Sequence, residues 1–237
     1  MSAAAEWAGV DIRLREPESE PAGALILNHG RGADENDLHG LIDELDPERR
    51  LLGVTTGAPW LGIPPGGRHW YVVERVGYPD PATFGRSYSA LGERLDSLLA
   101  EWRIDWSRAV IGGFSQGTVM SYALALGEGR PHPGGLVAMS GFIPEVDGWS
   151  ADLGARSALP VYVHHGANDP VIGVEFARAA RRRLQEAGFS LDYRETPAGH
   201  SLPPEILREV RDFAASATAA QAGTQPAGNA PAGTSPG

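Results

Sequence analysis

Residues 113–117 are Gly-Phe-Ser-Gln-Gly and fit the pattern G-x-S-x-G. An apolar run ending at Gly113 precedes the serine, and a helix-compatible run, QGTVMSYALAL, follows it. A sharp turn between a strand and a helix strains the backbone of its serine, and the flanking glycines remove side chains that would clash there. The serine hydroxyl is then exposed at the edge of the sheet. The motif therefore predicts that Ser115 is a nucleophile.

A serine hydroxyl needs a general base, usually a histidine that a carboxylate orients. In this setting the order along the chain is serine, acid, histidine. His200 lies in a loop between the last predicted strand and the last predicted helix, and Asp169 follows a strand and a glycine. Both positions lie at the carboxyl ends of strands, so we expect Ser115, Asp169 and His200 to form a catalytic triad.

The other histidines downstream of Ser115 fit the role of base less well. His132 leads into a strand, so we expect it at the opposite edge of the sheet. His164 and His165 are neighbours within a predicted strand, so their side chains point to opposite faces and cannot jointly chelate a metal. We expect these two to pack in the core or to support other side chains.

Acyl transfer also needs N–H donors for the negative charge that develops on the carbonyl oxygen. The backbone N–H of Gln116 lies at a predicted helix N-terminus, and that of Arg31 lies in the segment NHGRGAD after a strand. Gly30 and Gly32 allow this segment to approach a ligand closely. We therefore expect Arg31 and Gln116 to form an oxyanion hole.

The rest of the chain alternates strand-like and helix-like segments. Apolar runs that are typical of strands buried on both faces of a parallel sheet cover residues 24–28, 51–56, 109–113, 135–140 and 160–165. We expect edge strands over 189–195 and, antiparallel, over 7–14. Helical patterns cover residues 34–45, with Asp34 as N-cap, 86–102, 116–126, 173–187 and 203–217. This alternation predicts an α/β fold with a mostly parallel sheet, helices on both faces, and ligands beyond the carboxyl ends of the strands.

The length of 237 residues and the 42% of apolar residues suffice for one sizeable core. Residues 218–237 contain no charged, aromatic or branched aliphatic side chain. We expect a single domain over residues 1–217 and a disordered tail over 218–237. The long connections 57–84 and 141–159 are rich in Gly, Pro and Trp, and we expect them to form pocket walls.

The composition excludes several kinds of chemistry. The chain has no cysteine, and all 20 of its basic residues are arginine. Thiolate nucleophiles, thiolate metal sites and Schiff-base lysines are therefore excluded. The net charge of −10 disfavours nucleic acid and anionic membrane surfaces as partners. We expect no metal or cofactor, a monomer or homodimer without stable membrane association, and, since no apolar signal segment is evident, a cytoplasmic location.

Four segments together resemble a known family: residues 29–34, HGRGAD; 113–117, GFSQG; 166–170, GANDP; and 199–200, GH. Over roughly residues 20–215 the chain resembles the bacterial carboxylesterase, lysophospholipase and acyl-protein thioesterase family of α/β-hydrolases. The resemblance implies a small α/β-hydrolase without a large cap domain. It also implies hydrolysis of short- to medium-chain acyl esters, with thioesters and lysophospholipids as further candidate substrates. The triad and the two N–H donors named above match family positions.

The resemblance also implies a substrate pocket. Residues 140–144 and Trp70 match positions that line the acyl pocket of that family. Phe142, Ile143, Val171 and Leu202 flank the proposed catalytic loops, and we expect them to contact substrate. The chain departs from the best-known members at position 31, where arginine replaces leucine, and over residues 62–70, which are richer in Pro and Gly. The arginine side chain could favour an acidic substrate or point to solvent.

Two other functions compete with an esterase that forms an acyl-enzyme. A serine peptidase or amidase could use the same fold, although the prolyl-oligopeptidase kind usually carries a large extra domain for which this chain has no room. A hydrolase-like fold could also serve as a binding module without catalysis. The complete set of candidate catalytic groups argues against the binding module, because loss of function usually removes one of them.

Overall fold

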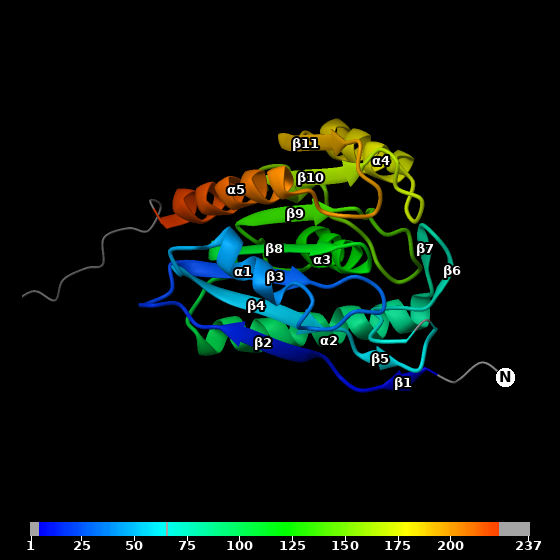
Figure 1. Cartoon of the computed structure of the whole chain (residues 1–237), viewed down its shortest axis with the longest axis horizontal. Coiled ribbons are helices and arrows are strands. Elements are labelled where there is room, and N and C mark those ends of the chain that lie inside the picture. The colour runs from blue at the N-terminus through cyan, green and yellow to red at the C-terminus, as the bar shows by residue number, and fades with distance from the viewer. Residues whose placement is uncertain (1–4, 65, 223–237) are drawn as a thin grey trace, which may run out of the picture.

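The computed structural model describes residues 5–64 and 66–222. A seven-stranded sheet forms the centre of the molecule (Figure 1). Its strands are β2 (Asp11–Arg15), β3 (Gly23–Asn28), β4 (Leu51–Gly57), β8 (Ala109–Phe114), β9 (Gly135–Met139), β10 (Val161–Gly166) and β11 (Leu191–Thr196). They lie in the order β11-β10-β9-β8-β3-β4-β2, and every pair is parallel except β2 with β4. The predicted parallel sheet with an antiparallel edge strand is therefore confirmed.

The apolar runs of the sequence correspond to β3, β4, β8, β9 and β10, which are buried along almost their whole length. The predicted edge strands β2 and β11 lie at the two edges of the sheet. The segment predicted as one strand over 7–14 is divided, because β1 (Glu6–Trp7) leaves the sheet and pairs with β5 (Trp60–Leu61). A hairpin of β6 (Val73–Arg75) and β7 (Tyr78–Pro79) lies within the long connection after β4.

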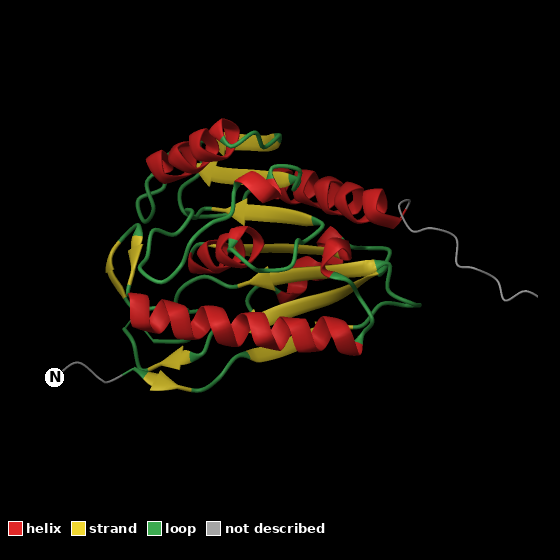
Figure 2. Ribbon diagram, turned by 180° about the vertical axis from the view of Figure 1, so that it is seen from behind, coloured by secondary structure: helices red, strands yellow, loops and turns green. Residues whose placement is uncertain are grey.

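Helices cover both faces of the sheet, as predicted (Figures 1 and 2). The helices are α1 (His39–Leu45), α2 (Pro81–Glu101), α3 (Gln116–Leu126), α4 (Val174–Glu186) and α5 (Pro204–Ala222), with short 3-10 turns at Trp106–Arg108 and Gly154–Arg156. Helices α1 and α5 contact each other on one face, and α2, α3 and α4 lie on the other. None of the helices in the described part of the chain is long and apolar enough to cross a membrane.

Two helices begin elsewhere than the sequence patterns predict. Helix α1 begins at His39, and Asp34 is not its N-cap, because the Asp34 carboxylate accepts the N–H of Asn36 at 2.8 Å in a preceding turn. Helix α2 begins at Pro81, where Asp80 accepts the N–H of Thr83 at 2.8 Å. An aspartate before a proline in the first turn is a strong helix start, so the prediction of residue 86 was wrong.

The predicted boundary of the C-terminal tail also changes. Helix α5 continues to Ala222, so residues 218–222 are helical rather than part of a disordered tail. The Thr218 hydroxyl donates to the carbonyl of Ala214 at 2.9 Å, and the residue is buried. The Thr218 side chain thus bonds within the last turns of α5. The composition of residues 218–222 alone does not predict such a bond. The rest of the predicted tail, 223–237, lies outside the described residues.

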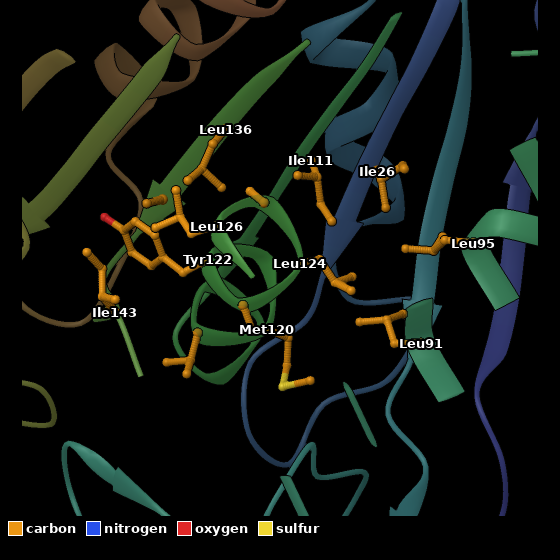
Figure 3. Packing of buried hydrophobic residues seen from close by; sticks show 14 of the residues in the cluster. Ile26, Leu91, Leu95, Ile111, Met120, Tyr122, Leu124, Leu126, Leu136 and Ile143 are labelled. Carbon is orange, nitrogen blue, oxygen red and sulfur yellow. The ribbon is translucent and has the colours of Figure 1, made fainter. Parts of the chain in front are cut away.

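Helix α3 is buried on all sides between the sheet and α2, and each of its eleven residues is buried. Figure 3 shows Met120 and Tyr122 of α3 among side chains of the sheet, such as Ile111, and of α2, such as Leu91. A helix that is enclosed on every side has no solvent-facing orientation, so its contacts with the core fix its position. The N-terminus of α3, which follows Ser115, is therefore held by the core.

The opposite end of α3 is held by a buried arginine. The guanidinium of Arg156, a residue that is 2% exposed, donates to the carbonyls of Ala125 at 2.9 Å and Gly127 at 2.8 Å. It also donates to the carbonyls of Arg130 and Pro131. A cation is favourable at a helix C-terminus, where the last carbonyls have no partner within the helix. Arg156 therefore ties α3 to the loop that leads into β9.

Replacing Arg156 with methionine should lower the free energy of unfolding by about 3 kcal/mol, because the buried carbonyls lose their donor. Urea denaturation measures this change. Arg50→Met is the matched control, since Arg50 is 54% exposed and its side chain pairs, among the described residues, only with the exposed Glu48. That control should stay within about 0.5 kcal/mol of the wild type. Equal losses in the two variants would contradict the role of Arg156.

Candidate active site

Ser115 occupies a strained turn between β8 and α3. Its φ and ψ are 56° and −120°, a conformation that costs a non-glycine residue about 1–3 kcal/mol. The two glycines of the motif are required by space, because a Cβ on Gly113 would lie 2.5 Å from the carbonyl carbon of Gly117. A Cβ on Gly117 would overlap the carbonyl of Asn28 on β3. The turn has the geometry that the motif predicts.

Asp169 and His200 are in direct contact. The Nδ1 of His200 lies 2.6 Å from Oδ2 of Asp169. The other carboxylate oxygen, Oδ1, accepts the backbone N–H groups of Val171 at 2.8 Å and Ile172 at 2.9 Å. Since a carboxylate accepts, Nδ1 carries the imidazole proton, and Nε2 of His200 is left unprotonated in the neutral ring. This is the tautomer that a general base needs.

The Asp169 carboxylate is buried, and opposing effects act on its pKa. Burial raises the pKa, while the hydrogen bonds from His200 and from the N–H groups of Ile172 and Val171 lower it. The net pKa lies below the usual value for aspartate, so the group is ionised at neutral pH. It can therefore stabilise a positive charge that forms on His200.

Ser115 and His200 line one cavity of about 290 Å³ at the carboxyl ends of the strands. The His200 ring packs against Phe114, with 4.7 Å between the ring centroids. Within residues 5–64 and 66–222 the Ser115 hydroxyl makes no hydrogen bond to His200, a contact that often tightens only around bound substrate. The structure thus brings the three predicted triad residues to one edge of the sheet.

Arg31 and Gln116 line the same cavity. In the described part of the chain, neither backbone N–H has a protein acceptor, and that of Gln116 is the first of helix α3. Unpaired N–H groups at a helix N-terminus favour an anion. The Gln116 side chain fixes the segment of Trp70 and Tyr71, because it accepts the N–H of Trp70 and donates to the carbonyl of Tyr71, each at 3.0 Å.

The loop that carries Arg31 is fixed by hydrogen bonds of His29, which is almost wholly buried. Its Nε2 accepts the N–H of Ala58 at 2.9 Å, so the ring proton is on Nδ1, which donates to the carbonyl of Gly30 at 2.6 Å. The indole N–H of Trp70 donates to the carbonyl of His29 at 2.9 Å. Burial lowers the pKa of His29 to about 4, so the ring is neutral at pH 7.

The predicted pocket residues divide into two groups. Phe142 and Val171 line the cavity. Trp70 does not, because it is wholly buried beneath the loop of His29. Ile143 faces a second cavity instead, and Leu202 packs in the partly buried layer around α5. These three thus lie outside the lining of this cavity, and their contact with substrate stays a prediction.

The long connection 57–84 supplies wall residues that the sequence did not single out. Tyr71 and residues 73, 75, 76 and 77, around the β6–β7 hairpin, line the cavity, together with Asp37 from the opposite side. The segment was predicted as a pocket wall, but its side chains carry no pattern that separates Tyr71 from Trp70. Among the described residues, no group of three or more His, Asp or Glu side chains could hold a metal ion.

The two departures from the family pattern meet in the structure. The exposed Arg31 guanidinium donates to the carbonyl of Pro64 at 2.6 Å. The adjacent N–H of Gly32 donates to the carbonyl of Arg68, and the N–H of Arg68 donates to the carbonyl of Ala33, each at 2.9 Å. The loop of Arg31 is therefore joined to Pro64 by a side-chain bond and to Arg68 by two backbone bonds.

Comparison with known proteins gives one consistent family. A family model described as Phospholipase/Carboxylesterase matches residues 11–217. Acyl-protein thioesterase 1 of Candida albicans is 28% identical over 222 residues, which cover 85% of this chain and 95% of the relative. Acyl-protein thioesterase 1 homolog 1 of Dictyostelium discoideum is 26% identical over 199 residues, covering 80% of this chain and 88% of the relative.

Solved structures agree on the fold. The Bacillus cereus carboxylesterase has a TM-score of 0.74 and 19% identity, with 88% of this chain and 94% of that chain covered. The carboxylesterase from Mesorhizobium loti has a TM-score of 0.71 and 20% identity, covering 89% and 98%. The predicted α/β-hydrolase fold is confirmed, and residues 5–64 and 66–222 include no large cap domain.

The buried neutral histidines predict an acid-sensitive fold. The pKa of His29 is about 4 in the folded protein and near 6.5 when exposed, so the unfolded chain binds more protons between these values. Stability is therefore full above pH 6.5 and falls as the pH drops toward 4. In His29→Gln, urea denaturation should show a slope against pH that is shallower by up to about 1.4 kcal/mol per pH unit.

His132→Gln is the control for this measurement, because His132 is exposed. Its stability should follow the wild-type dependence on pH throughout. A His29→Gln curve parallel to that of the wild type would show that His29 is not the buried neutral group inferred from its contacts.

Proposed function

The chain belongs to the phospholipase/carboxylesterase family, and from that premise we propose that Ser115 is the nucleophile of a serine hydrolase that cleaves carboxylic esters and thioesters. One observation supports this assignment above all. The buried carboxylate of Asp169 lies 2.6 Å from Nδ1 of His200 and orients its imidazole. His200 lines the same cavity as Ser115, which is held in a strained turn. That combination has no evident use in a merely structural turn.

The reaction follows from these groups. Ser115 Oγ attacks the acyl carbonyl carbon while Nε2 of His200 takes the hydroxyl proton. The N–H groups of Arg31 and Gln116 stabilise the negative oxygen, and Asp169 stabilises the imidazolium. The C–O or C–S bond then breaks, and His200 gives its proton to the leaving alcohol or thiol. Water, deprotonated by His200, repeats the attack and releases the acid from Ser115.

The cavity supports short- to medium-chain acyl groups as substrates. Its walls include the apolar side chains of Tyr71, Phe142 and Ile172 beside the serine. A second cavity of about 170 Å³ lies beyond Phe142 and Gly77, which line both cavities. Phe142 therefore limits the space available to the acyl chain. Cytoplasmic location and a monomeric or homodimeric state stay predictions.

Ser115→Ala should lower kcat for p-nitrophenyl esters from acetate to octanoate by on the order of a millionfold, because the acyl-enzyme cannot form. Steady-state release of p-nitrophenol measures the loss, and a fluorophosphonate probe should label the wild type but not the variant. Ser97→Ala on α2 is the control, since the exposed Ser97 donates its hydroxyl to the carbonyl of Glu93 in its own helix. Substantial activity in Ser115→Ala, or loss in the control, would refute the assignment.

Phe142→Ala should shift the preferred acyl chain to longer esters, because removing the ring joins the two cavities. The measurement is kcat/KM across p-nitrophenyl acetate to palmitate, with thioesters and lysophospholipids run beside them. Leu202→Ala should keep the wild-type profile, because Leu202 lies outside the described cavities. An unchanged profile in Phe142→Ala would show that the second cavity does not receive the acyl chain.

A further inference from the structure

The carboxylate of Asp169 is approached by a second histidine that the mechanism does not use. His165, at the end of β10, is wholly buried, and its Nε2 lies 3.5 Å from Oδ2 of Asp169. This is the same oxygen that accepts Nδ1 of His200. The Nε2 of His165 also lies 2.7 Å from the carbonyl of Ile172. One imidazole thus contacts both the catalytic carboxylate and the turn that follows it.

Two hydrogen bonds in series link His165 to the carboxylate through Ile172. The N–H of Ile172 donates to Oδ1 of Asp169, and the carbonyl of Ile172 accepts from His165. Strand β10 therefore holds Ile172, and Ile172 holds the carboxylate. We propose, on the basis of the function assigned above, that His165 is a positioning residue that orients Asp169 toward His200.

The contacts also determine what His165 can do. A carbonyl oxygen only accepts, so Nε2 carries the proton. The Nδ1 atom is buried and has no hydrogen-bond partner among the described residues. A second proton there would leave a buried N–H unpaired, which is costly. His165 therefore acts on this turn as a hydrogen-bond donor through Nε2.

His164 provides a control within the same strand. It is equally buried, but its side chain points to the other face, where Nε2 lies 3.0 Å from the hydroxyl of Thr196. Thr196 is also held by the backbone, because the N–H of Ala167 donates to its carbonyl at 2.7 Å. Loss of the His164 side chain therefore removes a buried imidazole without releasing Asp169.

The test compares two substitutions of equal length. His165→Gln keeps an N–H donor near the Nε2 position, and His165→Met removes it. With p-nitrophenyl butyrate, His165→Met should lower kcat by on the order of tenfold to a hundredfold while KM stays within about twofold, because a displaced carboxylate misorients the base without touching substrate. His165→Gln should recover most of that loss.

His164→Met and His164→Gln are measured in parallel, together with the thermal midpoint of every variant. We expect kcat to fall only when the donor at position 165 is removed. This should hold even if the His164 variants lower the thermal midpoint as much as His165→Met does. It is overturned if His165→Met keeps the wild-type kcat, if Gln is no better than Met at 165, or if His164→Met loses as much. Should His165→Met fail to fold, His165→Asn replaces it, because its shorter amide cannot reach the carbonyl of Ile172.

This experiment also separates the proposal from the function on which it rests. A wild-type protein that hydrolyses no ester and is not labelled by the fluorophosphonate overturns the assignment of Ser115. A wild type that is active and labelled, with a fully active His165→Met, overturns the role of His165 alone.

Discussion

A carboxylate that is buried beside the proposed catalytic centre can stay ionised only if hydrogen-bond donors replace the water that it has lost. Asp169 meets this condition on both oxygens. Two backbone N–H groups of its own turn donate to Oδ1, and Nδ1 of His200 donates to Oδ2. Because the same donors fix the direction of the carboxylate, the requirement for charge burial also determines the tautomer and orientation of the base.

The strain at Ser115 is tolerated because both sides of the turn are fixed. The N–H of Ser115 donates to the carbonyl of Met139 on β9 at 3.0 Å, and α3 is buried on every side. At its far end α3 is anchored by Arg156. A helix with a solvent-facing side could shift to relieve a strained residue, whereas one enclosed by the core cannot do so without opening cavities.

Sequence patterns predicted the sheet and the turn at Ser115, since both depend on local signals. Apolar runs mark β3, β8 and β10. Gly113 and Gly117 mark the turn, because a larger residue at either position would overlap backbone atoms. The pocket walls were predicted poorly. Trp70 and Tyr71 are adjacent buried aromatic residues, but the Trp70 indole bonds to the carbonyl of His29, whereas Tyr71 lines the cavity. The contact of His165 with Asp169 depends likewise on the path of the turn after β10. Neither contact leaves a periodic trace in the sequence.

The bonds from the Arg31 loop connect a donor of the proposed oxyanion hole to a surface segment at the exposed Pro64 and the partly buried Arg68. Surface segments tolerate insertions and substitutions more readily than buried ones. Sequence drift in that segment can therefore reach the reaction barrier without altering any group that touches substrate. Such substitutions would act on the rate through the Arg31 loop, whereas acyl-chain preference depends on the wall at Phe142.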